Sequence, residues 1–241
     1  MQTATNNTYH HSSDELSATS SVATLYHCVG ARSFRPLWVL EELQLDYELK
    51  MLAFPPRVCS SDFLSINPLG TVPAYVNGTH TMTESVAICQ LLAAQHSPRG
   101  LNVEADEYDY GLFLDLLHFG ESTLTFPHAL ILRYGQFEPN ERKLPQVVED
   151  YTSFFLGRLR KLDFMFAERD FLCAGRLTVA DISISYALLL AQYVGMLNKL
   201  PENVRRYWEG MRNYPSFLQA LSVEEAAAAE QGVSTVPVPL L

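Results

Sequence analysis

Closely spaced cysteines and an excess of cations are both missing from this 241-residue sequence. None of the four cysteines lies within three residues of another, which excludes a Cys-x-x-Cys redox motif and a zinc-type thiolate pair. Lys and Arg number 17 against 27 Asp and Glu, a net charge of −10, whereas phosphate binding needs clustered cations. We therefore expect reduced cysteines, no metal site and no nucleic-acid partner.

Targeting signals and long apolar runs are also missing. No Lys or Arg precedes Arg32, so neither a secretory signal nor a mitochondrial presequence is expected. Residues 1–21 are rich in Ser, Thr, Asn and Ala, a composition that predicts a flexible tail. The longest uncharged apolar run, 182–198, is slightly short for a membrane span and contains Ser, Gln and Gly, so it predicts a buried helix. We expect a cytoplasmic protein with no membrane partner.

Apolar residues make up 48% of the sequence, which is enough to bury a core. The pattern of predicted strands and helices changes clearly along the chain. A strand over 22–28, a helix over 33–45 and a strand over 47–53 predict a βαβ unit with parallel strands and a right-handed crossover. The following elements are a short helix over 61–66, a strand over 71–76, an Asn-Gly hairpin turn, a strand over 79–83 and a helix over 84–95. Residues 22–97 therefore predict one α/β domain.

The pattern beyond a linker at 98–105 is helical throughout. Helices are predicted over 108–132, 144–168, 179–197 and 204–221, which gives an all-α second domain over 106–222. The last stretch, 223–241, contains an alanine run and ends in Val-Pro-Val-Pro-Leu-Leu, and it is predicted to be a loosely held tail.

The segment Asn67-Pro68-Leu69-Gly70-Thr71-Val72-Pro73 puts a proline at the start of a strand. A cis peptide bond at Val72–Pro73 would turn the N–H and C=O groups of Val72 outward, where they can pair with an extended peptide ligand. The alternative is a trans proline on an edge strand.

A second motif, Thr83-Glu84-Ser85, opens the following helix. The unpaired N–H groups and positive dipole end of a first helical turn can hold a carboxylate, to which Ser85 can add its hydroxyl. Glu84 can accept a hydrogen bond from an ammonium group, so the motif suits the α-amino acid end of a ligand. An ordinary helix cap is the alternative. Thr178 and Asp181 instead form a structural capping box at the start of a very apolar helix.

The order of these elements, with the segments NPLGTVPAY, TESVAI and LTVADISI, resembles the glutathione transferase family over roughly residues 22–221. The resemblance implies a thioredoxin-like first domain that binds glutathione and a helical second domain that forms the acceptor site. It implies that Val72 pairs its backbone with the cysteinyl part of glutathione, that Pro73 is cis, and that Glu84 and Ser85 bind the γ-glutamyl end. It further implies that the protein is a homodimer. It also implies a reaction in which glutathione thiolate attacks an apolar, aromatic electrophile.

The residue that activates the thiol in this family lies after the first strand or at the start of the first helix. Ser33 occupies the helix start and resembles the activating serine of the serine-type classes, with a plain helix cap as its alternative role. Arg32 stands where the similar cysteine-type bacterial class has its cysteine, and Arg32 or Arg35 can add positive charge. The pattern GA-x-S-x-[KR]-P also occurs in the bacterial β-aryl etherase branch. Lowering a thiol pKa from about 8.5 by ~2 units requires roughly 2.7 kcal/mol.

Two parts of the predicted ligand site remain: the contact for the glycine carboxylate of glutathione and the lining of the acceptor site. The family often has a Lys, Arg or Gln before the Pro-started strand for the glycine carboxylate of glutathione, and Arg57 is the nearest substitute in this sequence. The candidates for lining the acceptor site are Phe113, Leu117, His118 and Phe126. A non-catalytic ligand-binding or scaffold protein and a glutathione-dependent isomerase remain the alternative functions.

Overall fold

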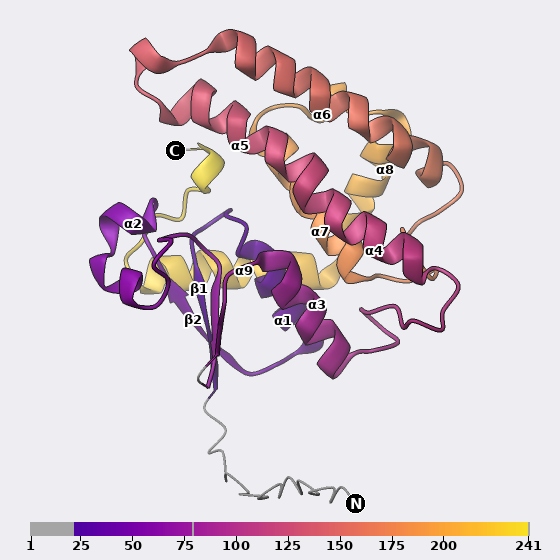
Figure 1. The fold of residues 1–241 in the computed structure, drawn as a ribbon, viewed down its shortest axis with the longest axis horizontal. Coiled ribbons are helices and arrows are strands. Elements are labelled where there is room, and N and C mark those ends of the chain that lie inside the picture. Colours follow the sequence, from indigo (N-terminus) through magenta and orange to yellow (C-terminus); the bar gives the residue numbers. More distant parts are fainter. Residues whose placement is uncertain (1–21, 79, 241) are drawn as a thin grey trace, which may run out of the picture.

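The first domain of the computed structural model has the predicted order of strands and helices (Figure 1). The structure describes residues 22–78 and 80–240, so the predicted N-terminal tail lies outside the described residues. The elements are β1 (Ala23–His27), α1 (Phe34–Leu43), β2 (Tyr47–Met51), α2 (Pro56–Cys59), a 3₁₀ turn (Ser61–Ser65), β3 (Ala74–Asn77), β4 (His80–Met82) and α3 (Ser85–His96).

The four strands form one mixed sheet in the order β2-β1-β3-β4. Strand β1 pairs in parallel with β2, as the βαβ unit predicted, and antiparallel with β3, where Leu25 lies opposite Tyr75. Strand β4 pairs antiparallel with β3 across the Asn-Gly turn. Because β1 is central, the chain leaves it at His27 from the middle of the sheet, and the turn into α1 emerges there.

The second domain contains helices and no strand within its described residues. Its elements are α4 (Tyr110–His118), a π-helical stretch (Phe119–Thr125), α5 (Phe126–Leu132), a second π-helical stretch (Arg133–Phe137), a 3₁₀ turn (Asn140–Arg142), α6 (Pro145–Phe166), α7 (Val179–Tyr193), a 3₁₀ turn (Leu197–Lys199), α8 (Glu202–Met211), α9 (Pro215–Glu230) and a 3₁₀ turn (Val238–Leu240). The prediction of a single helix over 204–221 is wrong, because two helices, α8 and α9, span this region. Pro215 lacks an N–H donor and cannot continue α8, so it occupies the first position of α9.

The central helix α7 is buried along nearly its whole length. The predicted capping box at its start is confirmed, since Asp181 accepts hydrogen bonds from the Thr178 N–H and hydroxyl, each at 2.9 Å. Asp181 also accepts from the Leu172 N–H at 3.0 Å and from the Tyr207 hydroxyl at 2.9 Å. No helix among residues 22–78 and 80–240 is long and apolar enough to cross a membrane.

Helix α9 returns from the second domain to pack against α1 and β2 of the first (Figure 1). The Trp38 indole N–H donates to the Ser216 hydroxyl at 2.8 Å, and the Trp38 and Phe217 rings meet edge to face with centroids 5.0 Å apart. Both aromatic side chains are fully or almost fully buried. The two domains therefore share one apolar core, which fixes the walls of any site between them.

The expectation of a loosely held tail over 223–241 is wrong for the described part. Alanine-rich sequence has a high helix propensity, and α9 continues through it to Glu230. Farther on, the Val238 N–H donates to the carbonyl of Val29 at 2.8 Å, and Pro237 packs against Gly30. The C-terminal segment is thereby held against the turn that joins β1 to α1.

Candidate functional site

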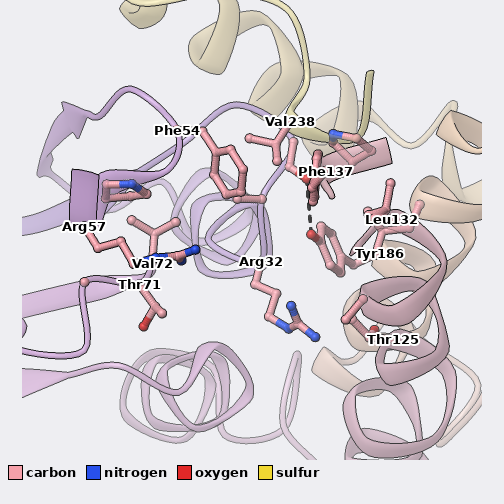
Figure 2. A pocket seen from close by; sticks show the side chains of 17 residues that line it. Arg32, Phe54, Arg57, Thr71, Val72, Thr125, Leu132, Phe137, Tyr186 and Val238 are labelled. Atoms are coloured by element: carbon pink, nitrogen blue, oxygen red, sulfur yellow. Dashed lines mark hydrogen bonds between the residues drawn. The ribbon is translucent and has the colours of Figure 1, made fainter. Parts of the chain in front are cut away.

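A pocket of about 220 Å³ lies between the two domains, at the turn that follows β1 (Figure 2). The first domain contributes Gly30, Ala31, Arg32, Phe54, Pro56, Arg57, Gly70, Thr71 and Val72. The second contributes Thr125, Ala129, Leu132, Phe137, Tyr186, Leu190, Val238 and Pro239. Polar and cationic groups come mainly from the first domain, whereas the second domain supplies a largely apolar wall.

The first-domain wall presents backbone groups that the protein itself leaves unpaired. The Val72–Pro73 peptide bond is cis, as predicted, and Val72 lines the pocket. Within the described residues, neither the N–H nor the C=O of Val72 takes part in a hydrogen bond. The N–H groups of Arg32 and Ser33, at the start of α1, likewise donate to no acceptor in that part of the chain. These groups are available to a peptide-like or anionic ligand.

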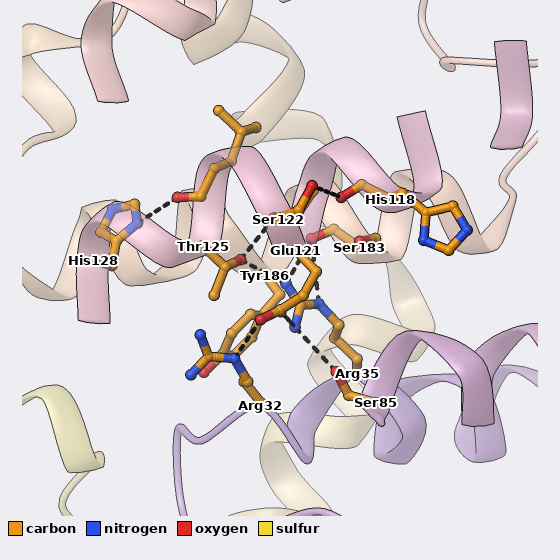
Figure 3. A network of polar contacts seen from close by, with 12 residues as sticks. Arg32, Arg35, Ser85, His118, Glu121, Ser122, Thr125, His128, Ser183 and Tyr186 are labelled. Carbon is orange, nitrogen blue, oxygen red and sulfur yellow. Dashed lines mark hydrogen bonds and ion pairs between the residues drawn. The ribbon is translucent and has the colours of Figure 1, made fainter. Parts of the chain in front are cut away.

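Two arginines meet one carboxylate beside this wall (Figure 3). The Arg32 Nε donates to Glu121 Oε1 at 2.7 Å, and the Arg35 Nη1 donates to Glu121 Oε2 at 2.5 Å. Burial disfavours the Glu121 carboxylate, but the charges of Arg35 and Arg32 outweigh burial and hold the pKa of Glu121 below its usual range. Arg35 is fully buried, whereas 37% of the Arg32 side chain is exposed. Only Arg32 of the two lines the pocket.

The Arg35 guanidinium also joins α1 to three other elements (Figure 3). It donates to the Ser85 hydroxyl of α3 at 3.2 Å, to the Thr125 hydroxyl at 2.6 Å and to the Ser183 carbonyl of α7 at 3.3 Å. It lies over the Tyr186 ring, 4.3 Å from the centroid. Because Ser85 accepts from Arg35, the proton of the Ser85 hydroxyl remains available for a ligand.

The start of α3 differs from the start of α7. Glu84 is the N-cap residue of α3, and no side chain caps this helix, whereas both halves of the α7 capping box are filled. Burial lowers the pKa of Arg32, but the Glu121 and Glu84 carboxylates are close enough to raise it above its usual value. The first turn of α3 is thus uncapped and lies near a cation, although Glu84 and Ser85 themselves do not line the pocket.

The structure places the Ser33 hydroxyl away from the pocket. Ser33 is fully buried, and its Oγ lies 2.6 Å from His27 Nδ1 and accepts from the Cys28 N–H at 3.4 Å. His27 Nε2 lies 2.8 Å from the Glu224 carboxylate, which can only accept, so Nε2 carries a proton. The short contact between His27 Nδ1 and Ser33 Oγ is a hydrogen bond that engages the Ser33 hydroxyl inside the core. Ser33 precedes α1 as predicted, but its side chain turns back towards β1 and makes no capping bond.

The four residues predicted to line the acceptor site do not line this pocket. Phe113 and Leu117 are fully buried in the core, His118 is exposed, and Phe126 packs against Tyr151. The helical face that reaches the pocket carries smaller side chains at spacings of four and three residues, Thr125, Ala129 and Leu132. Phe113 and Leu117 are used by the core and Phe126 by a contact between helices, which leaves Thr125, Ala129 and Leu132 as the side chains of this face that reach the pocket.

Phe54 and Phe137 come from different domains and form one edge of the pocket, with ring centroids 5.5 Å apart. Sequence reasoning missed both, as well as Tyr186, Leu190 and the C-terminal Val238, because no local pattern links these distant segments. Arg57, which was predicted, does line the pocket and forms no ion pair within the described residues. No group of three or more His, Cys, Asp or Glu side chains in that part of the chain is placed to hold a metal ion.

Comparison with known proteins points to one family. A model of the glutathione S-transferase N-terminal domain matches residues 21–94. Glutathione S-transferase 3 of Schizosaccharomyces pombe is 25% identical over 202 residues, which span 80% of this chain and 84% of that protein. A glutathione transferase of Methylococcus capsulatus superposes with a TM-score of 0.74 at 26% identity, covering 84% of this chain and 98% of its own.

A sphingomonad glutathione S-transferase solved in complex with glutathione superposes with a TM-score of 0.73 at 25% identity, over 88% of this chain and 100% of its own. The shared architecture is a thioredoxin-like domain with a mixed four-stranded sheet followed by a helical domain. The family model, the relatives and the solved structures are all of glutathione S-transferases, to which this chain is similar in sequence over residues 21–94 and in fold over most of its length.

Proposed function

We propose that this protein binds glutathione in the interdomain pocket and joins it, through its sulfur, to an apolar, aromatic electrophile. The observation that carries the proposal is the meeting of three features at one site: the unpaired backbone of Val72, the unpaired N–H groups of Arg32 and Ser33 just before α1, and the Arg32 guanidinium. A glutathione-like ligand needs all three, since it combines an extended peptide with a thiol that must ionise. The sphingomonad relative, whose structure contains glutathione, supports the choice of ligand.

The charged ends of glutathione match the polar groups around the pocket. The cysteinyl backbone pairs with Val72, in the manner of an added strand. The γ-glutamyl carboxylate takes the first turn of α3 and the Ser85 hydroxyl, while Glu84 accepts from the ammonium group. Arg57, a cation with no ion pair in the described chain, meets the glycine carboxylate.

The thiol lies at the start of α1 in this arrangement. We propose that it is activated by the N–H groups of Arg32 and Ser33 and by the positive charge of Arg32, and not by the Ser33 hydroxyl, which is engaged with His27. Hydrogen bonds to a charged group contribute about 1.5–3 kcal/mol each, so these donors are sufficient for the ~2.7 kcal/mol that ionisation at neutral pH requires.

The electrophile occupies the apolar wall between Phe54, Phe137 and Leu132. The thiolate forms a carbon–sulfur bond, and the leaving group departs with the electron pair of the bond that breaks. An aryl halide and an aryl ether both fit this scheme, and an apolar, aromatic site favours them over a charged acceptor.

Ser85→Ala is expected to raise the KM for glutathione about 10- to 100-fold with little change in kcat, because it removes a hydrogen bond to a carboxylate worth ~1.5–3 kcal/mol. Steady-state kinetics with an aryl halide would measure both constants. Ser65→Ala is the matched control, since Ser65 is exposed and donates only to the Asp62 carbonyl. An equal KM in the two variants would remove Ser85 from the glutathione site.

Turnover of the wild-type protein separates the proposed function from its alternatives. The assay panel contains an aryl halide, an aryl ether and a cis-enedione, each with glutathione. Conjugation or ether cleavage supports the transferase, and isomerisation of the cis-enedione alone supports the isomerase. Glutathione binding without turnover of any of them supports a non-catalytic binding protein.

A further inference from the structure

The turn that forms the floor of the pocket is held by contacts from the second domain. The Gly30 N–H donates to Glu224 Oε1 of α9 at 2.7 Å, and the Gly30 carbonyl accepts from the Tyr186 hydroxyl of α7 at 3.2 Å. The neighbouring Val29 carbonyl accepts from the Val238 N–H at 2.8 Å. Gly30 has a φ of +71°, a left-handed conformation that glycine adopts readily. The helical domain thereby fixes two consecutive residues just before Arg32.

Glu224 contributes most to this arrangement. Its carboxylate is 3% exposed, and Oε1 accepts from both the Gly30 N–H and His27 Nε2. His27 in turn lies against Ser33, so one buried chain of hydrogen bonds runs from α9 through the end of β1 to the start of α1. Glu224 ties together the residues on both sides of the turn, although it touches neither the pocket nor a ligand.

The same three side-chain types form the nucleophilic triad of many hydrolases, but burial excludes that role for them. Ser33 and His27 are fully buried and do not line the pocket, so no substrate carbon reaches the Ser33 oxygen. The titratable groups that face Glu224 are His27, Cys28, Tyr186 and Tyr193, none of which is a permanent cation. The buried Glu224 carboxylate instead makes two hydrogen bonds, one with the Gly30 N–H in the turn and one with His27 at the end of β1.

We propose that Glu224 is a positioning residue, which acts through the Gly30 N–H to direct the N–H groups of Arg32 and Ser33 at the glutathione sulfur. This inference rests on the proposed function. It assigns to α9, far from Arg32 and Ser33 in sequence, control over thiol ionisation. Glutathione affinity depends instead on Val72, Arg57 and the start of α3, which Glu224 does not touch.

The test compares Glu224→Gln with Glu225→Gln, a matched control on the exposed side of the same helix. Glu224→Gln keeps the shape but removes the charge, and we expect kcat to fall about tenfold or more, because small displacements of a reacting group are costly. The pH profile of kcat/KM is expected to move to higher pH, and the KM for glutathione to change little. A merely structural role for Glu224 would not produce this split between kcat and KM.

Hydrogen exchange at the Gly30 amide gives a second readout, with faster exchange expected in Glu224→Gln than in Glu225→Gln. Equal kcat, equal pH profiles and equal exchange in the two variants would overturn the proposal. If Glu224→Gln fails to fold, Tyr186→Phe removes only the hydroxyl that holds the Gly30 carbonyl and is expected to shift kcat in the same direction. Wild-type protein without turnover would instead overturn the proposed function, and Gly30 exchange would still decide whether Glu224 holds the turn.

Discussion

Replacing Arg35 with alanine is expected to lower the free energy of unfolding by about 3–5 kcal/mol, as breaking a buried ion pair by removing one partner typically does. The substitution leaves Glu121 with Arg32 alone and removes the donor that the Thr125 hydroxyl and the Ser183 carbonyl share. Urea unfolding followed by circular dichroism would measure the loss. Because Arg35 joins α1, α3 and α7, we expect the contact between the domains to weaken first.

Arg99→Ala is the matched control, since Arg99 pairs with Asp106 at 2.7 Å but the two side chains are 62% and 70% exposed. Solvent screens an exposed ion pair and leaves it with little effect on stability, so the control should be nearly neutral. The stability that charged Glu121 contributes is present above its unfolded pKa of 4.5 and is lost as the pH falls through the lower pKa of the folded state. Equal losses of stability in Arg35→Ala and Arg99→Ala would show that the buried pair does not hold the domains together.

Replacing Arg32 with alanine is expected to raise the apparent pKa of the bound thiol by about one unit and to lower kcat/KM near neutral pH about tenfold. The substitution removes the positive charge that lines the pocket beside the start of α1. The pH dependence of kcat/KM with a fast electrophile would measure the shift. Arg32→Lys, which keeps a charge but loses the planar guanidinium, should retain part of the effect.

Ser33→Ala provides the contrast to Arg32→Ala. The Ser33 hydroxyl is engaged with His27 inside the core, so its loss should cost roughly 1 kcal/mol of stability and leave the thiol pKa unchanged. A shift in Ser33→Ala without one in Arg32→Ala would restore the serine-type mechanism that the sequence suggested. The two variants therefore distinguish a hydroxyl from a positive charge as the activating group.

Local signals explain how much of the first domain could be predicted. The Asn77-Gly78 turn fixes the pairing of β3 with β4, and the βαβ pattern fixes the parallel pairing of β1 with β2. The cis bond before Pro73 was implied by the family resemblance, which the segment NPLGTVPAY helps to carry. Each of these features is decided by residues close together in the chain, which is why sequence reasoning could find them.

The site depends instead on contacts between distant segments. The sequence places Ser33 correctly before α1 but does not show that its side chain turns back to His27. Glu224 and Val238 reach the turn after β1 from the other end of the chain, through a segment predicted to be a loose tail. Large aromatic residues were expected at the acceptor site, but Phe113 is used by the core. Side-chain direction and long-range packing decide these placements, and neither is visible in a local pattern.

The proposed function requires one interdomain pocket to hold glutathione with its sulfur at the start of α1. A crystal structure of the wild-type protein with glutathione tests this most directly. We expect the sulfur within hydrogen-bond distance of the Arg32 and Ser33 N–H groups, the cysteinyl backbone paired with Val72, and the γ-glutamyl carboxylate at the first turn of α3. Glutathione bound elsewhere, or a Ser33 hydroxyl turned from His27 to the sulfur, would contradict it.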